Sequence, residues 1–406
     1  MTGSLNPEKI FNDYIIQRKT KTETIELLIT LLEGTDNEDI IINVLDILDR
    51  LEVRTKQIFK ILENLLISDE NPLVRSAAAK IIVKYFLKEV LSPIEWTIQH
   101  EKSSAVLKTL IKSFEKVDNQ YTRILKNELL RSIFGVVQEE ITFFLELDAL
   151  IEDYMELNVD FYKDFQTDDI SDVIRGRAVY AIKQGHVIGL NLAGWTMSVY
   201  SITAGSSAKS HKMIADCINY LPKSVENLKQ LQILDLSDCS MLRRLPKTLS
   251  NLKELQVLNL RNCLMLRKLP NQIGNLQSLE VLNLGACINI SVLPESICNL
   301  RNLRELKYNG DWAFMPLSTV PENIGNLQNL ENLELVGCKD LISLPESIGE
   351  LQSLEILDLS YCKNLRSLPE SLSNLLSLKK LILTECKAIK SLPESLTRKN
   401  SLIIIQ

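Results

Sequence analysis

The sequence predicts a protein of the class α + α/β solenoid, with helical hairpins first and then a horseshoe of coiled repeats that carries a parallel concave β-sheet. Two observations predict this class. In residues 21–117 apolar residues recur with helical periodicity in paired blocks, as expected for helices that each bury one face. From Leu231 onward a unit of 24 residues repeats, with one lengthened coil, and a fixed period of this size is typical of stacked repeats.

Composition narrows the range of functions. The chain has 406 residues, of which 45% are hydrophobic and 24% charged, and these values are typical of a globular protein. Its net charge is -6, and the acids concentrate between Glu139 and Asp172, where twelve acids accompany one base. A segment with this charge does not hold phosphate backbones, so we do not expect nucleic acid as a partner.

The first residues and the cysteines are used to predict the cellular location. The first residues, MTGSLNPEKIFNDY, have neither the pattern of a secretory signal nor a myristoylation motif. The uncharged window 187–208 is long enough to span a bilayer but contains Asn191 and a Ser/Thr cluster, so we interpret it as a strand and a loop and expect no membrane partner. Eight cysteines without a CxxC pair predict reduced thiols and a cytoplasmic location.

The first elements are helices. Residues 1–20 are assigned to an N-terminal tail and residues 21–135 to a helical domain that ends near Gly135. Helix starts in this domain are marked by a capping residue, alone or before a proline: Asp36 or Asn37, Asn71 with Pro72, and Ser92 with Pro93. The second helices of successive pairs recur at about 31 to 33 residues, the spacing of stacked hairpins that cannot bury their apolar faces alone.

One of these hairpins carries a family signature. The segment SDENPLVRSAAA, Ser68 to Ala79, has an acid in the turn, a proline, Val-Arg, and small alanines that let helices approach. It resembles the signature of HEAT repeats, and the neighbouring blocks match by pattern. The resemblance predicts a HEAT-like helical domain.

Residues 136–180 are assigned to an acidic helical connector and N-terminal cap, and residues 181–406 to the repeat domain. A last short helix is expected over residues 170–184. Aromatic residues alternate with the carboxylates of the connector: Phe143, Phe144, Tyr154, Phe161, Tyr162 and Phe165.

A degenerate first coil precedes the regular ones. Four of its residues occupy the same offsets as Leu231, Leu234, Leu236 and Cys239, namely Val187, Leu190, Leu192 and Trp195. This coil is 20 residues longer than the regular coils, through an insertion at residues 196–216.

The regular unit is LxxLxLxxCxxLxxLPxxIxxLxx, seen for example as LQVLNLRNCLMLRKLPNQIGNLQS. It resembles the leucine-rich repeat family, in particular the cysteine-bearing variety of intracellular plant resistance receptors and the LPxxI variety of Ras-suppressor-like proteins. The resemblance covers residues 187–406. It implies one strand per coil on a concave face and a partner protein bound there, with a small GTPase or its regulator as the partner suggested by family analogy.

One cysteine of each coil falls at a shared offset: Cys239, Cys263, Cys287, Cys338, Cys362 and Cys386. In many such repeats this position holds an asparagine that satisfies loop carbonyls. We favour buried thiols that donate weak hydrogen bonds over metal or redox chemistry. Asp311 interrupts the column, and Cys217 and Cys298 lie outside it.

The outward positions of the strands are candidates for binding a partner. The middle position of each strand is mostly polar: Asp235, Asn259, Asn283, Lys307, Glu334 and Asp358. The position two residues earlier is largely apolar: Ile233, Val257, Val281, Glu305, Asn332 and Ile356. This apolar column is a candidate contact core, although β-propensity alone would also explain it.

The coil that begins at Leu303 is 27 residues long, and repeat insertions map to loops at the rim. Its YNGDWAFMPL segment provides four more candidate anchors: Tyr308, Trp312, Phe314 and Met315. The alternative is that these side chains fold back and fill the gap beneath the longer loop. Tyr361 is a weaker candidate at the strand edge.

No motif predicts catalysis, a cofactor or a metal. The segment AGSSAKS lacks the glycines of a phosphate-binding loop, since Thr203 and Ala208 occupy their positions. His100, His186 and His211 have no metal-ligand spacing. We therefore predict a non-enzymatic protein–protein interaction scaffold. The alternative is a regulatory or sensor subunit whose acidic connector binds a basic partner segment.

The segment SLIIIQ predicts an eighth strand at residues 402–405. This strand closes the solenoid in the interpretation that we favour. Pairing of its edge with a second copy, as a homo-oligomer, is the other interpretation.

Overall fold

The computed structural model describes residues 6–86, 91–101, 103–117, 120–152, 166–168, 170–171, 180–193, 218–310, 314–397 and 402–406. The described residues divide into two compact units, one ending at Gly135 and the other beginning at Val136. Each unit has its own packed interior, so each is described by itself.

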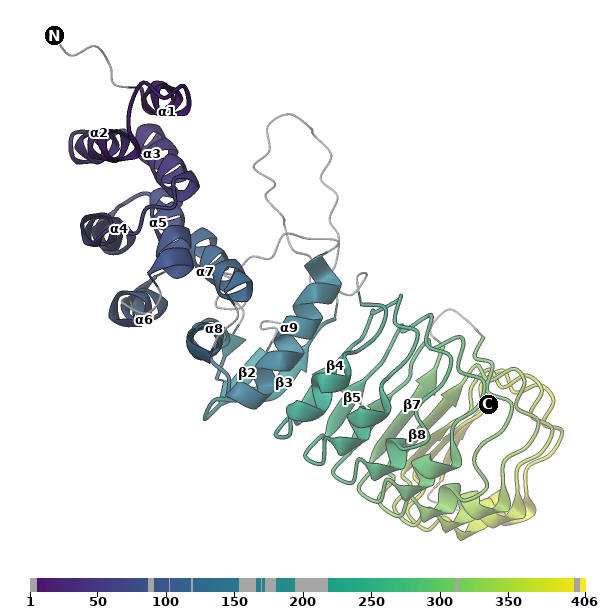
Figure 1. Ribbon diagram of the computed structural model, residues 1–406. Helices are drawn as coiled ribbons and strands as arrows, with labels where there is room; N and C mark the ends of the chain where they lie inside the picture. Colours follow the sequence, from purple (N-terminus) through teal and green to yellow (C-terminus); the bar gives the residue numbers. More distant parts are fainter. Residues whose placement is uncertain are drawn as a thin grey trace. The chain divides into compact units, whose positions relative to one another are not determined.

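The first unit consists of stacked helical hairpins (Figure 1). Its helices are α1 (Pro7–Ile15), α2 (Lys21–Glu33), α3 (Glu38–Arg50), α4 (Lys56–Ser68), α5 (Pro72–Tyr85), α6 (Leu91–His100), α7 (Ser104–Lys116) and α8 (Gln120–Phe134). α3, α5 and α7 pack in sequence to form one layer, and α4, α6 and α8 form the other. This arrangement confirms the predicted helical repeats, while the assignment to the HEAT type stays a prediction.

The helix starts follow from their capping residues. Asn37 accepts a hydrogen bond from the Ile40 amide at the start of α3, as predicted. Asn71 caps α5 in the same way, and Pro72 occupies its first turn, where a missing N–H costs nothing. At the other end of the unit α8 stops before Gly135, whose φ of 67° only glycine adopts without strain.

Residues 7–15, which the sequence assigned to a tail, form α1 instead. Asn6 caps this helix and Pro7 begins it. Pro7, Ile10 and Phe11 are buried, because their i, i+3, i+4 spacing places them on the side of α1 that packs against α2 and α3. The assignment of this segment as a tail was therefore wrong.

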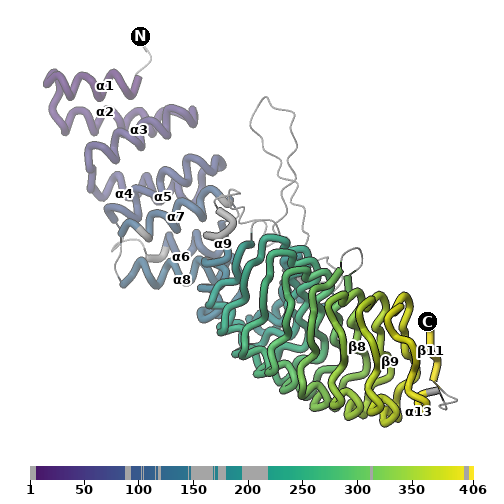
Figure 2. Tube along the Cα trace, turned by 90° about the vertical axis from the view of Figure 1, so that its right-hand side faces the viewer, coloured from purple at the N-terminus to yellow at the C-terminus, as the bar shows by residue number. Residues whose placement is uncertain are grey.

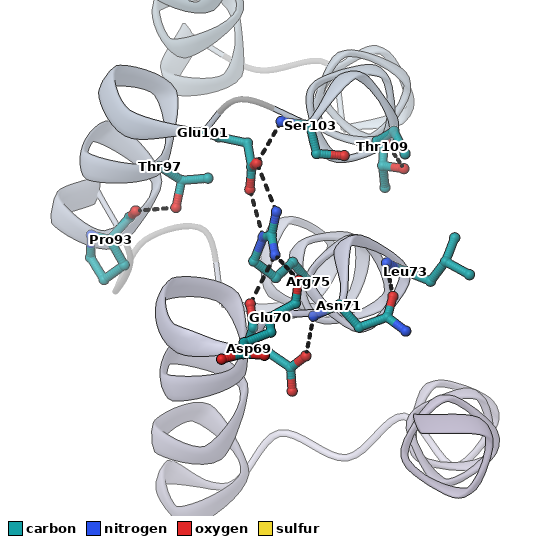
Figure 3. Close-up of polar contacts among 11 residues, drawn as sticks. Asp69, Glu70, Asn71, Leu73, Arg75, Pro93, Thr97, Glu101, Ser103 and Thr109 are labelled. Carbon is teal, nitrogen blue, oxygen red and sulfur yellow. Dashed lines mark hydrogen bonds and ion pairs between the residues drawn. The ribbon is translucent and has the colours of Figure 1, made fainter. Parts of the chain in front are cut away.

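Ion pairs join neighbouring hairpins of the first unit. The Arg75 guanidinium binds both carboxylate oxygens of Glu101, at 2.8 and 2.9 Å, and also donates to the backbone oxygens of Asp69 and Glu70 (Figure 3). Arg75 is the arginine of the Val-Arg pair in the HEAT-like segment. It therefore links the turn before α5 to the turn between α6 and α7.

In its described residues, the second unit is organised around a sheet of 11 strands in sequence order. They are β1 (Gln166–Thr167), β2 (Tyr180–Lys183), β3 (His186–Asn191), β4 (Ile233–Asp235), β5 (Val257–Asn259), β6 (Val281–Asn283), β7 (Glu305–Asn309), β8 (Asn332–Val336), β9 (Ile356–Asp358), β10 (Lys380–Ile382) and β11 (Ile403–Ile405). From β3 onward each strand pairs in parallel with the next, and Figure 2 shows the coils stacked side by side. The predicted parallel repeat sheet is confirmed.

The degenerate first coil has the predicted register, because Leu190 of β3 pairs with Leu234 of β4. The prediction of a short helix over residues 170–184 is wrong for the last part of that range. Tyr180–Lys183 is β2, which pairs antiparallel with β3 through a turn at Gln184 and Gly185 with φ of 52° and 79°. Two positive φ values in a two-residue loop are typical of a tight hairpin.

The leucines of the repeat fill the interior. Leu234, Leu258 and Leu282, for example, are fully buried at the same offset of successive coils, and each buried leucine contributes about 1.5 to 3 kcal/mol. After the Leu-Pro step the chain turns through a short 3-10 helix: η2 (Lys223–Asn227), η3 (Lys247–Asn251), η4 (Ile273–Asn275), η5 (Glu295–Asn299), η6 (Ile324–Asn326), η7 (Glu346–Glu350) and η8 (Glu370–Asn374). The last turn, α13 (Glu394–Thr397), packs on η8.

Helix α9 (Gln138–Glu152) packs against η2. Its Glu140 accepts hydrogen bonds from the Val187 amide at 2.9 Å and from His186 at 3.1 Å, and burial raises the pKa of the Glu140 carboxyl. Its Phe143 and Phe144 are fully buried. α9 therefore covers the first coil, whose apolar interior has no preceding coil to bury it.

Candidate functional site

The candidate functional site is the face of the sheet that points away from the leucine interior, and we call it the sheet face. Its side chains come from alternate strand positions, and parallel pairing in register aligns equivalent positions of neighbouring coils. Asp235, Asn259 and Asn283 are aligned in this way, as are Val257, Val281 and Glu305. The two columns predicted from the sequence are therefore real columns on one face.

The apolar column is open only in part. Ile233 is 7% exposed, because it packs with Ala181 and Ile188 in a small cluster that Ile170 and Val257 also join. The prediction of Ile233 as an exposed contact residue is therefore wrong. Val257, Val281 and Ile356 are half-buried and remain accessible.

The polar column is already organised by hydrogen bonds. Asn259 donates to Asp235 at 3.1 Å, and Glu334 accepts from both Asn309 at 2.6 Å and Asn332 at 3.1 Å. Lys307 pairs with Glu305 at 2.6 Å. These contacts hold the polar side chains in fixed positions, and Asn283 and Asp358 continue the column on β6 and β9.

Tyr308 is a core residue, and its prediction as an exposed anchor is wrong. It is fully buried, and its hydroxyl donates a hydrogen bond to the backbone oxygen of Ile290. It lies five residues after Leu303, the same offset that Leu236 holds after Leu231. This offset in the sequence was the signal that assigns Tyr308 to the interior.

Met315 is also fully buried and was wrongly predicted as an anchor. Its amide donates to Gly337 at 3.0 Å, and it forms a parallel bridge with Cys338. Met315 therefore takes the place that a column cysteine holds in the regular coils. Met315 lies twelve residues after Leu303, whereas the column cysteines lie eight residues after the first leucine of their coil, so its sequence position did not reveal this equivalence.

Among the residues that the structure describes, Phe314 and Tyr361 are the accessible aromatic residues of this rim, 54% and 46% exposed. The Lys363 ammonium lies 5.0 Å from the centre of the Phe314 ring, which is within the range of cation–π attraction. Tyr361 has a φ of 62°, and other coils show positive φ at the same offset, for example Asp238 and Ala286. The turn after each strand therefore orients the side chain at this offset toward the rim.

The column cysteines serve as hydrogen-bond donors. Cys263, Cys287 and Cys386 donate to the leucine carbonyl five residues into the preceding coil, with S···O distances of 3.2, 3.1 and 2.9 Å. Burial raises the pKa of Cys287 to about 12 and that of Cys386 to about 11. The thiols therefore stay protonated at neutral pH, and the structural interpretation of the column is confirmed for these residues.

Some candidate residues lie outside the described residues. Trp312, Trp195 and Cys217 are among them, as is the 196–216 insertion. Most of the acidic connector after α9 is not described either. Within the described ranges, no group of three or more His, Cys, Asp and Glu residues could hold a metal ion. Among the helices described, none is both long and apolar enough to cross a membrane.

Comparison with known proteins agrees with the repeat geometry. The leucine-rich repeat region family matches residues 247–342, and the Leucine Rich Repeat family matches residues 230–252 and 353–375. A comparison with curated protein sequences gave no significant match.

The chain is similar to several solved structures, including the following three. The leucine-rich repeat domain of the type III effector XopL is 22% identical over 79% of this chain and 94% of that chain, with a TM-score of 0.43. A leucine-rich repeat protein of Leptospira interrogans is 22% identical over 47% and 69%, with a TM-score of 0.27. The Arabidopsis receptor kinase HAESA, in complex with the peptide hormone IDA and a co-receptor, is 20% identical over 67% and 53%, with a TM-score of 0.34.

The coils, their inward leucines and their parallel sheet define a repeat solenoid, a class that uses extended faces for binding. Within that class, the family matches and the 24-residue unit identify the repeats of residues 230–375 as leucine-rich repeats, and a helical region precedes them.

Proposed function

We propose that this chain is a non-enzymatic scaffold that binds a partner protein on the sheet face of its repeats and on the Phe314–Tyr361 rim. The observation that carries the proposal is the alignment of half-buried apolar side chains beside a fixed polar column. Val281 and Ile356 provide apolar surface that becomes buried on binding. The Glu334 carboxylate accepts hydrogen bonds from two asparagine side chains, so its charge is already held in position. A prearranged polar group costs little ordering entropy on association.

The proposal places the protein in the cytoplasm, because its column cysteines act as protonated donors and need a reducing environment. A small GTPase or its regulator is one partner that the family resemblance suggests. The proposal does not depend on this identity, since the sheet face would serve any protein of complementary shape and charge.

The test uses two charged substitutions on the sheet face. Lys380 occupies the same offset as Val281 and Ile356, so the chain accepts lysine at this position. We expect Val281→Lys/Ile356→Lys to lose its partners, because it puts unpaired charges into a contact core. The measurement is quantitative affinity purification of the full chain with mass spectrometry.

The matched control is Asn299→Lys/Asn374→Lys. It adds the same charge to the same two coils, at exposed positions in η5 and η8 on the convex side. This control is expected to keep the partners of the natural chain. Recovery of the same partners by the Val281→Lys/Ile356→Lys variant would overturn the assignment of the sheet face.

A further inference from the structure

A second surface of the repeats combines exposed cations with exposed apolar side chains. It lies between the column cysteine and the Leu-Pro step, on the flank of the coils that begin at Leu231, Leu255 and Leu279, and we call it the basic-apolar flank. Its cations are Arg243, Arg244, Arg267 and Lys268, all exposed. Its apolar members are between 37% and 55% exposed: Met241, Leu264, Met265, Ile288 and Val292.

The flank is a prearranged surface. Successive coils are tied together there by backbone hydrogen bonds, from the Arg243 amide to Asn219 at 3.0 Å and from the Met265 amide to Ser240 at 3.1 Å. The Asn289 side chain adds a bond to the Leu264 oxygen at 2.6 Å. Equivalent side chains therefore stand one coil apart in fixed columns, about 4.8 Å from one another.

The charge of the flank is not neutralised within the surface. Between the column cysteine and the Leu-Pro step these three coils contain no Asp or Glu. Within the described part of the chain, none of the four cations forms an ion pair with a carboxylate. Arg244 instead lies over the Tyr220 ring, 5.9 Å from its centre. Unpaired cations in fixed columns attract a partner of opposite charge and suppress a basic one.

The apolar members decide which kind of anionic partner fits. Single-stranded nucleic acid binds through several aromatic side chains on which successive bases stack, whereas the apolar members of this flank are Leu, Met, Ile and Val. The Tyr220 ring beside them is 39% exposed and has the Arg244 guanidinium 5.9 Å from its centre. Membrane insertion needs apolar side chains that protrude, whereas these are about half covered by their own coil. A surface of half-buried apolar side chains between cations is complementary to a protein segment in which acidic and apolar residues alternate.

We propose that the basic-apolar flank binds an acidic segment of a partner protein, with apolar side chains between its carboxylates. The cations set the charge and orientation of the segment, and Leu264 and Met265 provide the buried contact at its centre. This site is separate from the sheet face, so it goes beyond the function proposed above and can fail or succeed independently of it.

The test is a selection of peptides from a random-sequence display library on the full chain. We expect the enriched peptides to alternate Asp or Glu with large apolar residues. One such peptide, made synthetically, then serves as the probe in fluorescence anisotropy. Arg243→Glu/Arg267→Glu should weaken its binding by at least about tenfold, and added salt should weaken binding to the natural chain because the cations are exposed.

A second variant tests the apolar contacts without removing charge. Leu264→Lys/Met265→Asn introduces residues that other coils carry at the same offsets, as Lys363 and Asn364 do, so the fold should tolerate it. We again expect a loss of at least about tenfold, although the added lysine raises the positive charge. Simple electrostatic attraction predicts the opposite change.

The matched control is Arg366→Glu/Lys390→Glu, which reverses exposed cations at the same offset as Arg243 and Arg267 in later coils. Its binding should change by less than about twofold. The proposal is overturned if no acidic-apolar peptides are enriched, or if this control weakens the probe as much as Arg243→Glu/Arg267→Glu does. Tighter binding of phosphatidylserine vesicles or of a single-stranded oligonucleotide than of the peptide, or self-association that depends on the flank, would also overturn it.

Discussion

At the scale of single residues, position in the repeat decides what a side chain does. Tyr308 and Tyr361 are both aromatic residues near the lengthened coil, yet one is fully buried and the other is 46% exposed. The difference follows from offset, because residue five of a coil points into the leucine interior and residue seven lies on the turn after the strand. Residue type alone therefore misplaced Tyr308, and its offset would have placed it correctly.

The buried hydroxyl of Tyr308 allows a sharp test of this assignment. Tyr308→Phe removes the donor to Ile290 and leaves a buried carbonyl without it, so we expect a loss of about 1 to 3 kcal/mol in the free energy of unfolding. The measurement is chemical denaturation of the full chain. Tyr361→Phe is the control, with an expected change within about 0.5 kcal/mol because that hydroxyl is on an exposed side chain. Equal effects of the two changes would contradict the inward position of Tyr308.

At the scale of elements, contacts between helices far apart in the sequence hold the first unit together. Asp49 of α3 pairs with Lys84 at 2.6 Å and with Lys80 at 3.0 Å, both on α5. Burial alone would raise the pKa of the Asp49 carboxyl, but hydrogen bonds from these two lysines hold it below its ordinary value. The charged form is therefore favoured by folding.

Asp49→Asn should destabilise the α3–α5 contact by about 1 to 3 kcal/mol at neutral pH. Because the folded pKa lies below the ordinary 3.8, this stabilisation is present above that value and is lost as pH falls through the folded pKa. The natural chain and the variant should thus converge in acid. Hydrogen exchange of the α3 and α5 amides measures the effect.

The control for this element is Asp46→Asn, which removes an exposed ion pair with Arg50 on the same helix. Such a pair contributes about 0.3 to 0.5 kcal/mol. A difference between the natural chain and Asp49→Asn that persisted unchanged below the folded pKa would show that the carboxylate charge is not the cause.

At the scale of the whole molecule, the stability of each coil depends on its contacts with the neighbouring coils. Each inner coil of the second unit packs against the coil before it and the coil after it, so a defect in one coil should weaken adjacent strands most. We expect Leu282→Ala to cost about 2 to 5 kcal/mol and to speed hydrogen exchange in β5, β6 and β7 more than in β10 and β11.

Leu376→Ala provides the comparison for this prediction. Leu376 is 84% exposed, so its truncation removes little buried area and should leave exchange unchanged. Uniform acceleration from β4 to β11 in the Leu282→Ala variant would indicate that the sheet unfolds as one cooperative block, against the nearest-neighbour picture.

The repeat sheet could be predicted from the sequence alone, because a fixed period forces the same side chains inward in every coil. The sequence also predicted the register of the first coil at Leu190, the helix starts at Asn37 and Asn71, and the last strand, since these depend on local spacing and capping. It gave both columns of the sheet face, since strand alternation fixes which residues point outward.

Which outward residues stay accessible depends on contacts that form only in the folded chain. Ile233 is covered by Ala181 and Ile188, which come from β2 and β3 and not from its own repeat. Met315 lies in the cysteine column because it forms a bridge with Cys338 of the next coil. α1 and β2 formed because neighbouring elements offered them an apolar surface or a strand edge. Burial depends on contacts between distant segments, and no local pattern contains that information.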